Sequence, residues 1–384
     1  MCAQLTFAVP ARFHDFEKDL PSLEGKVVCV TGCTTGTGFI AARTAAKKGA
    51  HVVMLNRQSA RAEAAEKSLL EVAPGSNVTS VACDLQSFDS LPTKATKLQQ
   101  ELIRVSADFR PFSDKLLAKP DKFEAKQLFC IDVLCNNAGV MALADEATKD
   151  GYDVQMQTNH LSHFLLTKEL YPLLEKAAQE RGDARIVNHS SGARKFPSKE
   201  LDADYLGKNG GSLGGNGNSM FFGGARWQRY HQTKLANAVF TLALDERLRA
   251  KNSKVKALCA APGLAATNLQ VTTNQADGFN DAWMMRFAQS GEDGTMPLLT
   301  CCVGEGVQSG EFYEPDGMAA MKGKPTKIDL EPICTKPESR NILWHLDETC
   351  GANFHVRFAK GFMASSTYNM GCVWGAPLAP FAQI

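Results

Sequence analysis

The chain has 384 residues, of which 44% are hydrophobic and 22% are charged, and this globular composition excludes long disorder, collagen-like repeats and a coiled coil. Its 42 Lys and Arg nearly balance 41 Asp and Glu, so bulk charge gives no reason to expect nucleic acid or an anionic membrane as a partner. No stretch reaches about 18 apolar residues, and the 12 cysteines include no C-x-x-C pair. We therefore expect an intracellular protein, cytoplasmic in the simplest case, with reduced thiols and no transmembrane segment.

Six short apolar runs alternate with longer amphipathic stretches from residue 26 onwards. The runs are rich in Val, Ile, Leu and Cys and cover residues 26–31, 51–56, 78–83, 131–136, 184–190 and 254–260. Such runs are typical of strands that are buried on both faces of a parallel sheet. Helical spacing is found in the stretches 39–49, 59–72, 152–180 and 230–250. The alternation predicts a single α/β domain with a doubly wound parallel sheet, the Rossmann fold.

Two segments interrupt this alternation. Residues 95–128, approximately, are charged and make one connection longer than a single helix needs, so we interpret them as an inserted helix or surface loop. Residues 196–226, approximately, are rich in Gly and Asn, yet Met220, Phe221, Phe222 and the adjoining Trp227 form an apolar cluster. This cluster favours a lid, with plain loop packing as the alternative. With an N-terminal arm over 1–24 and a C-terminal extension over 352–384, we expect the α/β domain to cover 25–351.

A glycine-rich turn stands where the first expected strand meets the first helix. Its residues are Gly32, Thr34, Thr35, Gly36, Thr37 and Gly38, in the spacing G-x-x-x-G-x-G. Glycines there allow a tight turn and a close approach to a pyrophosphate, while the following helix offers unpaired N–H groups and the positive end of its dipole. The turn therefore predicts a dinucleotide site.

The end of the second strand favours one nicotinamide cofactor over the other. An NAD site normally places Asp or Glu at this point, whereas here the strand runs into Arg57 and no carboxylate follows until Glu63. A guanidinium matches a 2′-phosphate with its forked donors. We therefore expect NADP(H) in preference to NAD(H), the alternative being that Arg57 is an ordinary solvated loop residue.

Tyr230 and Lys234 are four positions apart on an expected helix, so their side chains share one face. A tyrosine at its reference pKa near 10 is a poor base at neutral pH, and a neighbouring ammonium stabilises the phenolate. The pair can therefore act as a tunable acid and base. His160 and His163 are also close on a helix, but no Cys or carboxylate pattern completes a metal site around them, so no metal is predicted.

Taken together, the motifs resemble those of the classical short-chain dehydrogenase/reductase family, nearest to its retinol-dehydrogenase-like and protochlorophyllide-reductase-like branch. The matching pieces appear in the family's order between Gly25 and about Gln270: TGCTTGTG at 31–38, CDL at 83–85, NNAG at 136–139, QTNHLSHFLLT at 157–167, RIVNHSSGA at 185–193, YHQTKLAN at 230–237 and APGLAAT at 261–267. One departure is the 39-residue interval from Ser191 to Tyr230, which requires the Gly-rich segment to loop out and return.

The resemblance implies a role for each matching residue. Tyr230 would donate the proton to a carbonyl, Lys234 would hold the nicotinamide ribose, and Ser191 would bond the substrate oxygen, with Ser190 as the alternative serine. Asn159 would use its backbone carbonyl to hold a water next to Lys234. The remaining positions would contact the cofactor. They are Asp84 at the adenine, Leu85 next to it in the sequence, Asn137, Ala138 and Gly139 in the cleft, and Pro262, Gly263 and Thr267 on the nicotinamide side.

The function expected from these residues is an NADP(H)-dependent oxidoreductase that interconverts an alcohol and a carbonyl of a small, fairly apolar substrate. A non-catalytic NADPH-binding regulatory or redox-sensing protein is the alternative, and a sugar-nucleotide epimerase is disfavoured by the glycine spacing. The light-driven activity of the protochlorophyllide reductases is disfavoured, because those enzymes have a cysteine shortly after the active-site lysine, where this chain has Leu235, Ala236 and Asn237. The resemblance further implies a homo-oligomer formed through the helices that bear Asn159 and Tyr230.

Overall fold

The computed structural model describes residues 10–91, 130–197, 200–217, 223–266 and 288–349. The chain divides into two compact units, Met1–Phe354 and His355–Ile384, and every described residue belongs to the first. The insertion expected at about 95–128, the extension expected at 352–384 and the side chains of Met220, Phe221 and Phe222 lie outside the described residues.

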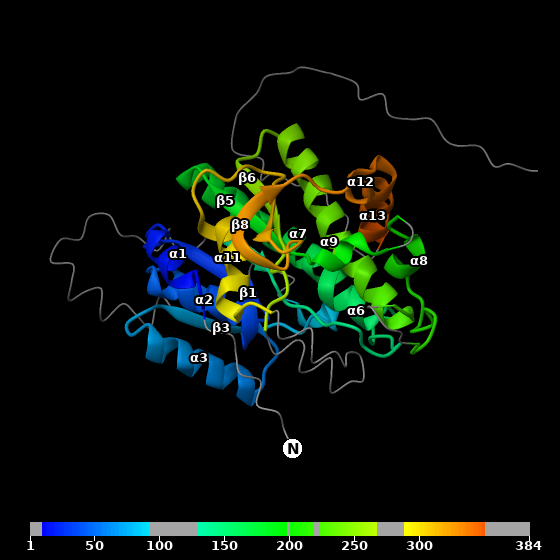
Figure 1. Ribbon diagram of the computed structural model, residues 1–384, viewed down its shortest axis with the longest axis horizontal. Helices are drawn as coiled ribbons and strands as arrows, with labels where there is room; N and C mark the ends of the chain where they lie inside the picture. Colours follow the sequence, from blue (N-terminus) through cyan, green and yellow to red (C-terminus); the bar gives the residue numbers. More distant parts are fainter. Residues whose placement is uncertain (1–9, 92–129, 198–199, 218–222, 267–287, 350–384) are drawn as a thin grey trace, which may run out of the picture. The chain divides into compact units, whose positions relative to one another are not determined.

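The described residues form an eight-stranded sheet in the order β3-β2-β1-β4-β5-β6-β7-β8, shown in Figure 1. Its strands are β1 (Val27–Thr31), β2 (His51–Asn56), β3 (Val78–Ala82), β4 (Val133–Asn136), β5 (Ala184–His189), β6 (Val255–Ala260), β7 (Phe312–Gly317) and β8 (Lys322–Ile328). All neighbouring pairs are parallel except β7 and β8, which are antiparallel. The six predicted strands and the doubly wound fold are confirmed, while β7 and β8 were not among the predictions.

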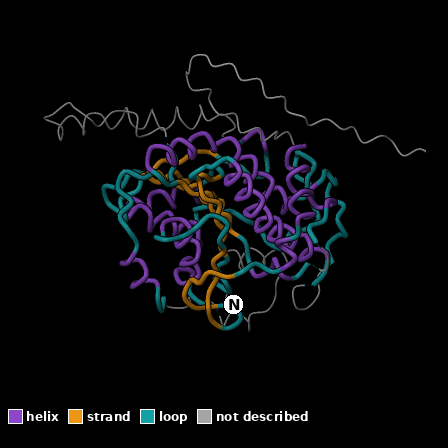
Figure 2. Tube along the Cα trace, turned by 90° about the horizontal axis from the view of Figure 1, so that it is seen from above, coloured by secondary structure: helices purple, strands orange, loops and turns teal. Residues whose placement is uncertain are grey.

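Helices cover both faces of this sheet, as Figure 2 shows. Helices α2 (Gly36–Lys47), α3 (Ala60–Val72) and α11 (Gly291–Val303) pack on one face, and α7 (Ser162–Arg181) and α9 (Ala225–Ala250) pack on the other. The remaining helical elements are α1 (Phe13–Asp19), α6 (Val154–Met156), α8 (Ala203–Leu206), α12 (Pro332–Thr335), α13 (Pro337–Thr349), two 3₁₀ turns (Phe88–Ser90 and Gly192–Lys195) and a π-helical turn (Gln157–Leu161). The π-helical turn interrupts what the sequence predicts as one continuous helix over 152–180.

The strand sequences are consistent with helices on both faces of the sheet. Every residue of β1, β2 and β4 is buried, including both the even and the odd positions, because helices lie on either side. One core cluster joins the sheet to α2 and α11 through residues such as Val30, Met54, Ile40 and Leu298. The strand order reverses between β1 and β4, and in doubly wound sheets ligands bind at such a point, outside the carboxyl ends of the strands.

Helix α13 packs against α9 on the side away from the sheet. Its Trp344 lies edge-on to Phe164 of α7, with ring centroids 5.4 Å apart, and stacks at 6.5 Å on Phe240 of α9. The Arg247 guanidinium lies 3.6 Å from the centroid of a Trp344 ring. Part of the helical face through which a homo-oligomer is expected is therefore covered by the chain's own helix. Among the helices of the described residues, none is long and apolar enough to cross a membrane.

Candidate active site

The residues that the sequence singles out lie on the loops and helix ends that follow the strands at the carboxyl edge of the sheet. They follow β1 (Gly32 to Gly38), β2 (Arg57), β3 (Asp84, Leu85), β4 (Asn137 to Gly139), β5 (Ser191) and β6 (Pro262, Gly263), with Asn159 in the π-helical turn and Tyr230 and Lys234 in α9. Thr267 is outside the described part of the chain. Parallel strands present their carboxyl ends at one edge, which is why loops far apart in sequence meet there.

The glycine-rich turn is packed against the loop after β4 without room for side chains. Gly32 has a φ of +63°, and a Cβ added to it would lie 2.7 Å from the Cβ of Ala138. A Cβ on Gly38 would overlap the side-chain amide of Asn137 and lie 2.5 Å from the Gly32 carbonyl oxygen. Real Cβ atoms do not approach that closely, so both positions require glycine.

Hydrogen bonds fix the same two loops to each other. The Asn137 side-chain amide donates to the carbonyl oxygens of Thr31 (3.0 Å) and Gly32 (3.3 Å), and its oxygen accepts from the Thr37 hydroxyl at 2.9 Å. The Thr31 hydroxyl oxygen in turn accepts from the backbone N–H of Ala138 at 3.0 Å. The turn after β1 and the loop after β4 therefore form a single rigid cradle.

Helix α2 begins at this cradle with its N-terminus open. Its N-cap Thr35 makes no side-chain hydrogen bond to the first turn, and that turn contains no acidic residue. Free N–H groups and the positive end of the helix dipole are what a phosphate needs. The cradle and this helix start thus fit the pyrophosphate of a dinucleotide.

Arg57, Asp84 and Leu85 lie further along the same edge of the sheet. Arg57 is exposed directly after β2, and within the described residues its guanidinium has no hydrogen bond or ion pair. Asp84 is half-buried and its carboxylate accepts from the backbone N–H of Gln86 at 3.0 Å. The Leu85 side chain is buried, and its carbonyl oxygen accepts from the Ser162 hydroxyl at 2.7 Å.

Asn159 is held in the π-helical turn by contacts to two other elements. Its side-chain oxygen accepts from the Val140 N–H (2.7 Å), and its amide donates to the Val140 carbonyl and to the Thr233 hydroxyl, both at 2.9 Å. The Asn159 backbone carbonyl, which the resemblance assigns to a water, lies 3.0 Å from Nδ1 of His163. This contact also gives His163 a structural position, and burial lowers the pKa of its imidazole to about 3.

Lys234 is almost completely buried and reaches the end of β5. Its Nζ donates to the His189 carbonyl oxygen at 3.0 Å and lies 5.7 Å from the centroid of the Tyr230 ring. Burial lowers the pKa of Lys234 to about 8, because a charged ammonium is poorly solvated there. A Cβ on Gly139 would lie 3.5 Å from the same Nζ, which places the NNAG loop beside it.

The two adjacent serines after β5 point in different directions. The buried Ser190 hydroxyl donates to the Lys234 carbonyl oxygen at 2.7 Å, so it is occupied by the backbone of α9. Ser191 instead forms a side-chain hydrogen bond with Tyr230 and accepts from the Ala193 N–H at 3.2 Å. Of the two, Ser191 is the serine that shares the space in front of Tyr230.

Tyr230 differs in one respect from the electrostatic expectation. Burial raises its pKa to about 12, and the hydrogen bond to Ser191 acts in the opposite direction but is the smaller effect. The ammonium of Lys234, directed at the His189 carbonyl, does not offset the burial. Tyr230 is consequently a protonated phenol at neutral pH.

An apolar wall lines the site next to Tyr230. Met141, Ala142, Trp227 and Tyr230 form one buried cluster, with Ala193 packed against it. The Trp227 and Tyr230 rings meet edge to face with centroids 5.9 Å apart. Trp227 lies in the first turn of α9, because that helix begins at Ala225, inside the insertion predicted to extend to residue 226.

Arg229 anchors the described part of the Gly-rich insertion. Its guanidinium is completely buried and donates to the carbonyl oxygens of Leu213 (3.0 Å) and Gly215 (2.8 Å) in the insertion and of Leu143 (3.1 Å) after β4. Asp145 and Asp153 lie 3.6 and 3.5 Å from it. Burial raises the pKa of Asp153 to about 6, an effect that the nearby Arg229 only partly offsets. The insertion thus leaves and returns, as the long interval between Ser191 and Tyr230 requires.

The loop after β6 is closed by the C-terminal half of the chain. Gly263 has a φ of +67°, and a Cβ there would lie 2.8 Å from the Ala320 carbonyl oxygen. The Gln289 side-chain amide donates to the Pro262 carbonyl oxygen at 2.8 Å.

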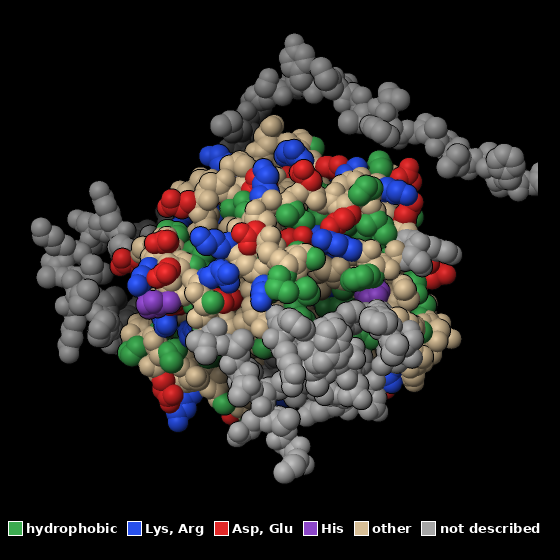
Figure 3. All heavy atoms as spheres, in the orientation of Figure 1, with side chains coloured by type: hydrophobic (Ala, Val, Ile, Leu, Met, Phe, Trp, Pro, Cys, Tyr) green, Lys and Arg blue, Asp and Glu red, His purple; other side chains and the backbone are tan. Residues whose placement is uncertain are grey.

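No group of three or more His, Cys, Asp or Glu side chains in the described ranges is placed to hold a metal ion. On the face in Figure 3, acidic and basic side chains are interspersed.

Several contacts that shape the site were not predicted. Thr31, His189 and Arg229 hold it together, but a threonine or histidine in a strand and an arginine on a helix carry no sequence signal that distinguishes them from ordinary residues. The one signal that could have found them is their position in or next to the family motifs.

Comparison with known proteins gives the family. The model of the short chain dehydrogenase family matches residues 26–107 and 121–203. Human retinol dehydrogenase 12 is 30% identical over 298 residues, which is 76% of this chain and 78% of that protein. An uncharacterised oxidoreductase of Schizosaccharomyces pombe is 32% identical over 253 residues, 65% of this chain but only 63% of the yeast protein, so the chain spans less than two thirds of that relative.

A solved structure agrees with these sequence relationships. A protein of unknown function from Mycobacterium paratuberculosis aligns with a TM-score of 0.59 and 26% identity, covering 87% of this chain and 96% of the other. The resemblance predicted from the motifs is thereby confirmed. The chain belongs to the short-chain dehydrogenase/reductase family of oxidoreductases, which bind a nicotinamide cofactor and act on small substrates, and its relatives include retinol dehydrogenases.

Proposed function

We propose that this protein is an NADP(H)-dependent oxidoreductase that interconverts a carbonyl and an alcohol on a fairly apolar small molecule, with Tyr230 as the acid and base. The observation that carries the proposal is the meeting of Tyr230, Ser191 and Lys234 at the carboxyl edge of the sheet, beside a glycine cradle without room for side chains. A protein that only bound the cofactor would have no need for the first two.

The cradle and the start of α2 would hold the pyrophosphate, and Lys234 would hold the nicotinamide ribose through its ammonium. The closeness of Gly32, Gly38 and Ala138 supports this, since side chains at the two glycines would collide with the loop after β4 and with the turn itself and so distort the cradle. When bound, the nicotinamide supplies the hydride, and the protein supplies placement, charge and protons.

Tyr230 would donate its phenolic proton to the substrate oxygen during reduction. With a pKa of about 12 the phenol stays protonated at neutral pH, which suits a proton donor. Ser191 would hold the same substrate oxygen, because its hydroxyl already bonds Tyr230. The charged Lys234 would stabilise the phenolate left behind, so its proton is needed for the step.

Arg57 supports the choice of NADP(H) over NAD(H). It follows β2, where the adenosine ribose is expected in this fold, and its exposed guanidinium is uncommitted among the described residues. The wall of Met141, Ala142 and Trp227 supports an apolar substrate, since these side chains offer no hydrogen-bonding group but the indole N–H.

The decisive experiment is Tyr230→Phe, assayed by NADPH oxidation with a panel of lipophilic aldehydes and ketones. Loss of the proton donor is expected to lower kcat by about 10² or more, while the Kd of NADPH stays within about threefold. Tyr313→Phe is the matched control, because the Tyr313 hydroxyl bonds Glu311 and not the site. Full activity of Tyr230→Phe would refute the proposed role, and NADPH binding without turnover in the wild type would favour a regulatory protein.

Arg57→Ala tests the cofactor preference. Removing the charge-assisted bonds to a 2′-phosphate is expected to raise the KM for NADPH roughly 10- to 100-fold and to leave that for NADH nearly unchanged. Lys67→Ala removes another exposed cation from α3 and should change neither value. Equal effects of Arg57→Ala on both cofactors would contradict the preference.

A further inference from the structure

Arg194 is a completely buried cation three residues after Ser191. It belongs to the 3₁₀ turn Gly192–Lys195, which Ser191 caps through its side chain. Together with Arg229, it is the largest fully buried side chain in the described part of the protein. Charged groups are rarely buried unless they are paired, so its partners show what it does.

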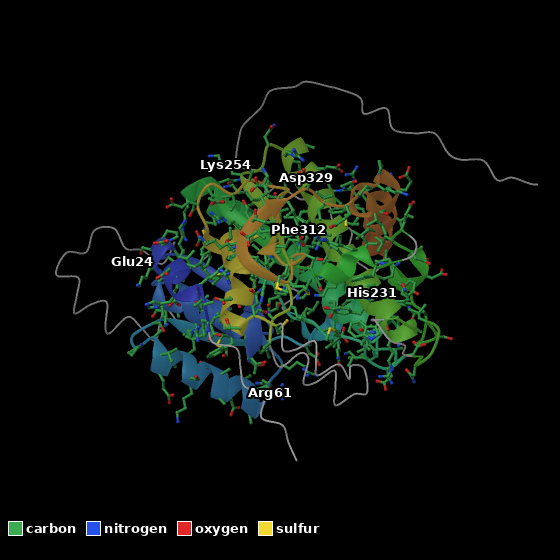
Figure 4. All side chains as sticks on the ribbon, in the orientation of Figure 1. Glu24, Arg61, His231, Lys254, Phe312 and Asp329 are labelled. Atoms are coloured by element: carbon green, nitrogen blue, oxygen red, sulfur yellow. The ribbon has the colours of Figure 1, made fainter. Side chains whose placement is uncertain are left out.

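The guanidinium is held by the C-terminal part of the chain. Nε and Nη2 donate to the two carboxylate oxygens of Glu331 at 3.0 and 2.9 Å, and Nη2 also donates to Glu314 at 2.8 Å. The guanidinium lies 4.2 Å from the centroid of the Phe312 ring, which Figure 4 labels on β7. Both carboxylates and the ring therefore fix the plane of the guanidinium.

The remaining arm of the guanidinium reaches back to Ser191. Nη1 donates to the Ser191 carbonyl oxygen at 3.2 Å, and the Arg194 backbone N–H donates to the same oxygen at 3.1 Å. The Ser191 carbonyl oxygen is thus held by two N–H groups of Arg194, while the Ser191 hydroxyl bonds Tyr230 and accepts from the Ala193 N–H. A shift of the guanidinium would be transmitted to Ser191 through this carbonyl.

We propose that Arg194 is a positioning residue that sets the Ser191 hydroxyl against Tyr230, and that it makes the geometry of the site depend on the hairpin β7–β8 and on the start of α12. The inference rests on the proposed function, in which Ser191 holds the substrate oxygen. It assigns an active-site task to Glu314 and Glu331, which lie more than 100 positions beyond Ser191 in the sequence.

Geometry, rather than stability alone, explains why an arginine occupies this position. Apolar side chains of similar volume commonly replace a buried ion pair without loss of stability, so the pair by itself is a weak reason for its presence. A guanidinium, however, is planar and can bond a carboxylate in bidentate fashion while a further N–H points elsewhere. An ammonium also has several donors, but it lacks the planar fork that bonds both oxygens of one carboxylate side by side.

The neighbouring Lys195 supplies a matched control. Its Nζ lies 3.2 Å from Glu314 and 3.1 Å from Glu331, the same two carboxylates, but its side chain is 37% exposed and, within the described part of the chain, it does not bond Ser191. Removing Lys195 therefore changes the charge balance of the cluster without releasing the Ser191 carbonyl.

The test is a double-mutant cycle with Arg194→Gln and Ser191→Ala, assayed by NADPH oxidation with decanal and all-trans-retinal as probes. Arg194→Gln is expected to lower kcat by about 10², the usual cost of an approximately 1 Å misplacement, with the KM for NADPH nearly unchanged. Once Ser191 is alanine, the second substitution is expected to change kcat less than about twofold. Independent losses that multiply in the double variant would overturn the proposal.

Two further variants separate position from charge. Arg194→Lys keeps the cation, so it is expected to recover the Tm of the wild type but not its kcat; recovery of kcat would overturn the proposal. Lys195→Gln is expected to retain the kcat of the wild type, and a loss equal to that of Arg194→Gln would show that the charge of the cluster, not Arg194, is responsible.

Crystal structures of the wild type and of Arg194→Gln provide a readout that needs no turnover. The Ser191 hydroxyl is expected to move away from the Tyr230 hydroxyl in the variant, and an unmoved hydroxyl would overturn the inference. If neither probe supports NADPH oxidation by the wild type, the proposed function fails. The position of the Ser191 hydroxyl in the two crystal structures still decides the role of Arg194.

Discussion

Gly38 offers a direct test of whether the turn after β1 and the loop after β4 act as one cofactor cradle. In Gly38→Ala the new Cβ would overlap the Asn137 side-chain amide and lie 2.5 Å from the Gly32 carbonyl oxygen. Neither contact can relax by rotating a flexible side-chain end, because Asn137 is bonded to the Thr31 and Gly32 carbonyls and the second contact is to backbone. The two loops must therefore move apart.

The magnitude follows from the cost of overpacking. An extra methyl group in a closely packed site destabilises by about 1–3 kcal/mol, partly offset by the better helix propensity of alanine. The free variant can relieve the strain by opening the cradle, but cofactor binding requires the original geometry. The strain would then be restored in the complex, which predicts a Kd for NADPH about 10 to 100 times that of the wild type.

Isothermal titration with NADPH measures this effect, and urea denaturation measures the change in the free energy of unfolding. Gly217→Ala is the matched control, since Gly217 is exposed in the Gly-rich insertion and a Cβ there meets nothing within 4 Å. A Kd for Gly38→Ala within about twofold of the wild type would refute the idea that the close packing of the cradle serves the cofactor.

Two further predictions concern pH and the helical face. Because burial lowers the pKa of Lys234 to about 8, the ammonium is lost as pH rises through that value, so kcat/KM for carbonyl reduction is expected to fall above about pH 8; a profile that is flat to pH 10 would contradict this role. Trp344→Ala would leave Phe164 and Phe240 uncovered, at a cost of about 3–5 kcal/mol and roughly 10 °C in Tm. Because α13 covers part of this face, we expect sedimentation to show no dimer of the wild type that forms through it. A dimer joined by α7 and α9 would refute that expectation.

The sequence predicts those parts of the fold that depend on local patterns. Strands β1, β2 and β4 are continuous apolar runs because helices cover both faces, and this pattern is visible without a structure. Strands β7 and β8 were missed because FYEPDG and KGKPTKI contain prolines and charges, which are tolerated in an antiparallel pair at the end of the sheet. The pairing partner, not the composition, makes them strands.

The site was predictable to a similar extent. The spacing of Tyr230 and Lys234 and the glycines of the turn indicate which residues meet, because each signal is local. The raised pKa of Tyr230 was not predictable, since it depends on burial among Met141, Trp227 and their neighbours. The π-helical turn that carries Asn159 has no sequence signal at all.

Arg229 also limits what the Gly-rich insertion can do. A lid must open, but opening residues 211–217 would break the bonds from Arg229 to Leu213 and Gly215 and separate a completely buried guanidinium from its surroundings. Asp145 and Asp153 would still face the guanidinium, but two hydrogen bonds to a charged group, worth about 1.5–3 kcal/mol each, would be lost, which would keep the open state below roughly 1% of the population. Residues 211–217 are therefore better understood as a fixed segment that is held on Arg229 and Asp145, so the lid hypothesis does not extend to them.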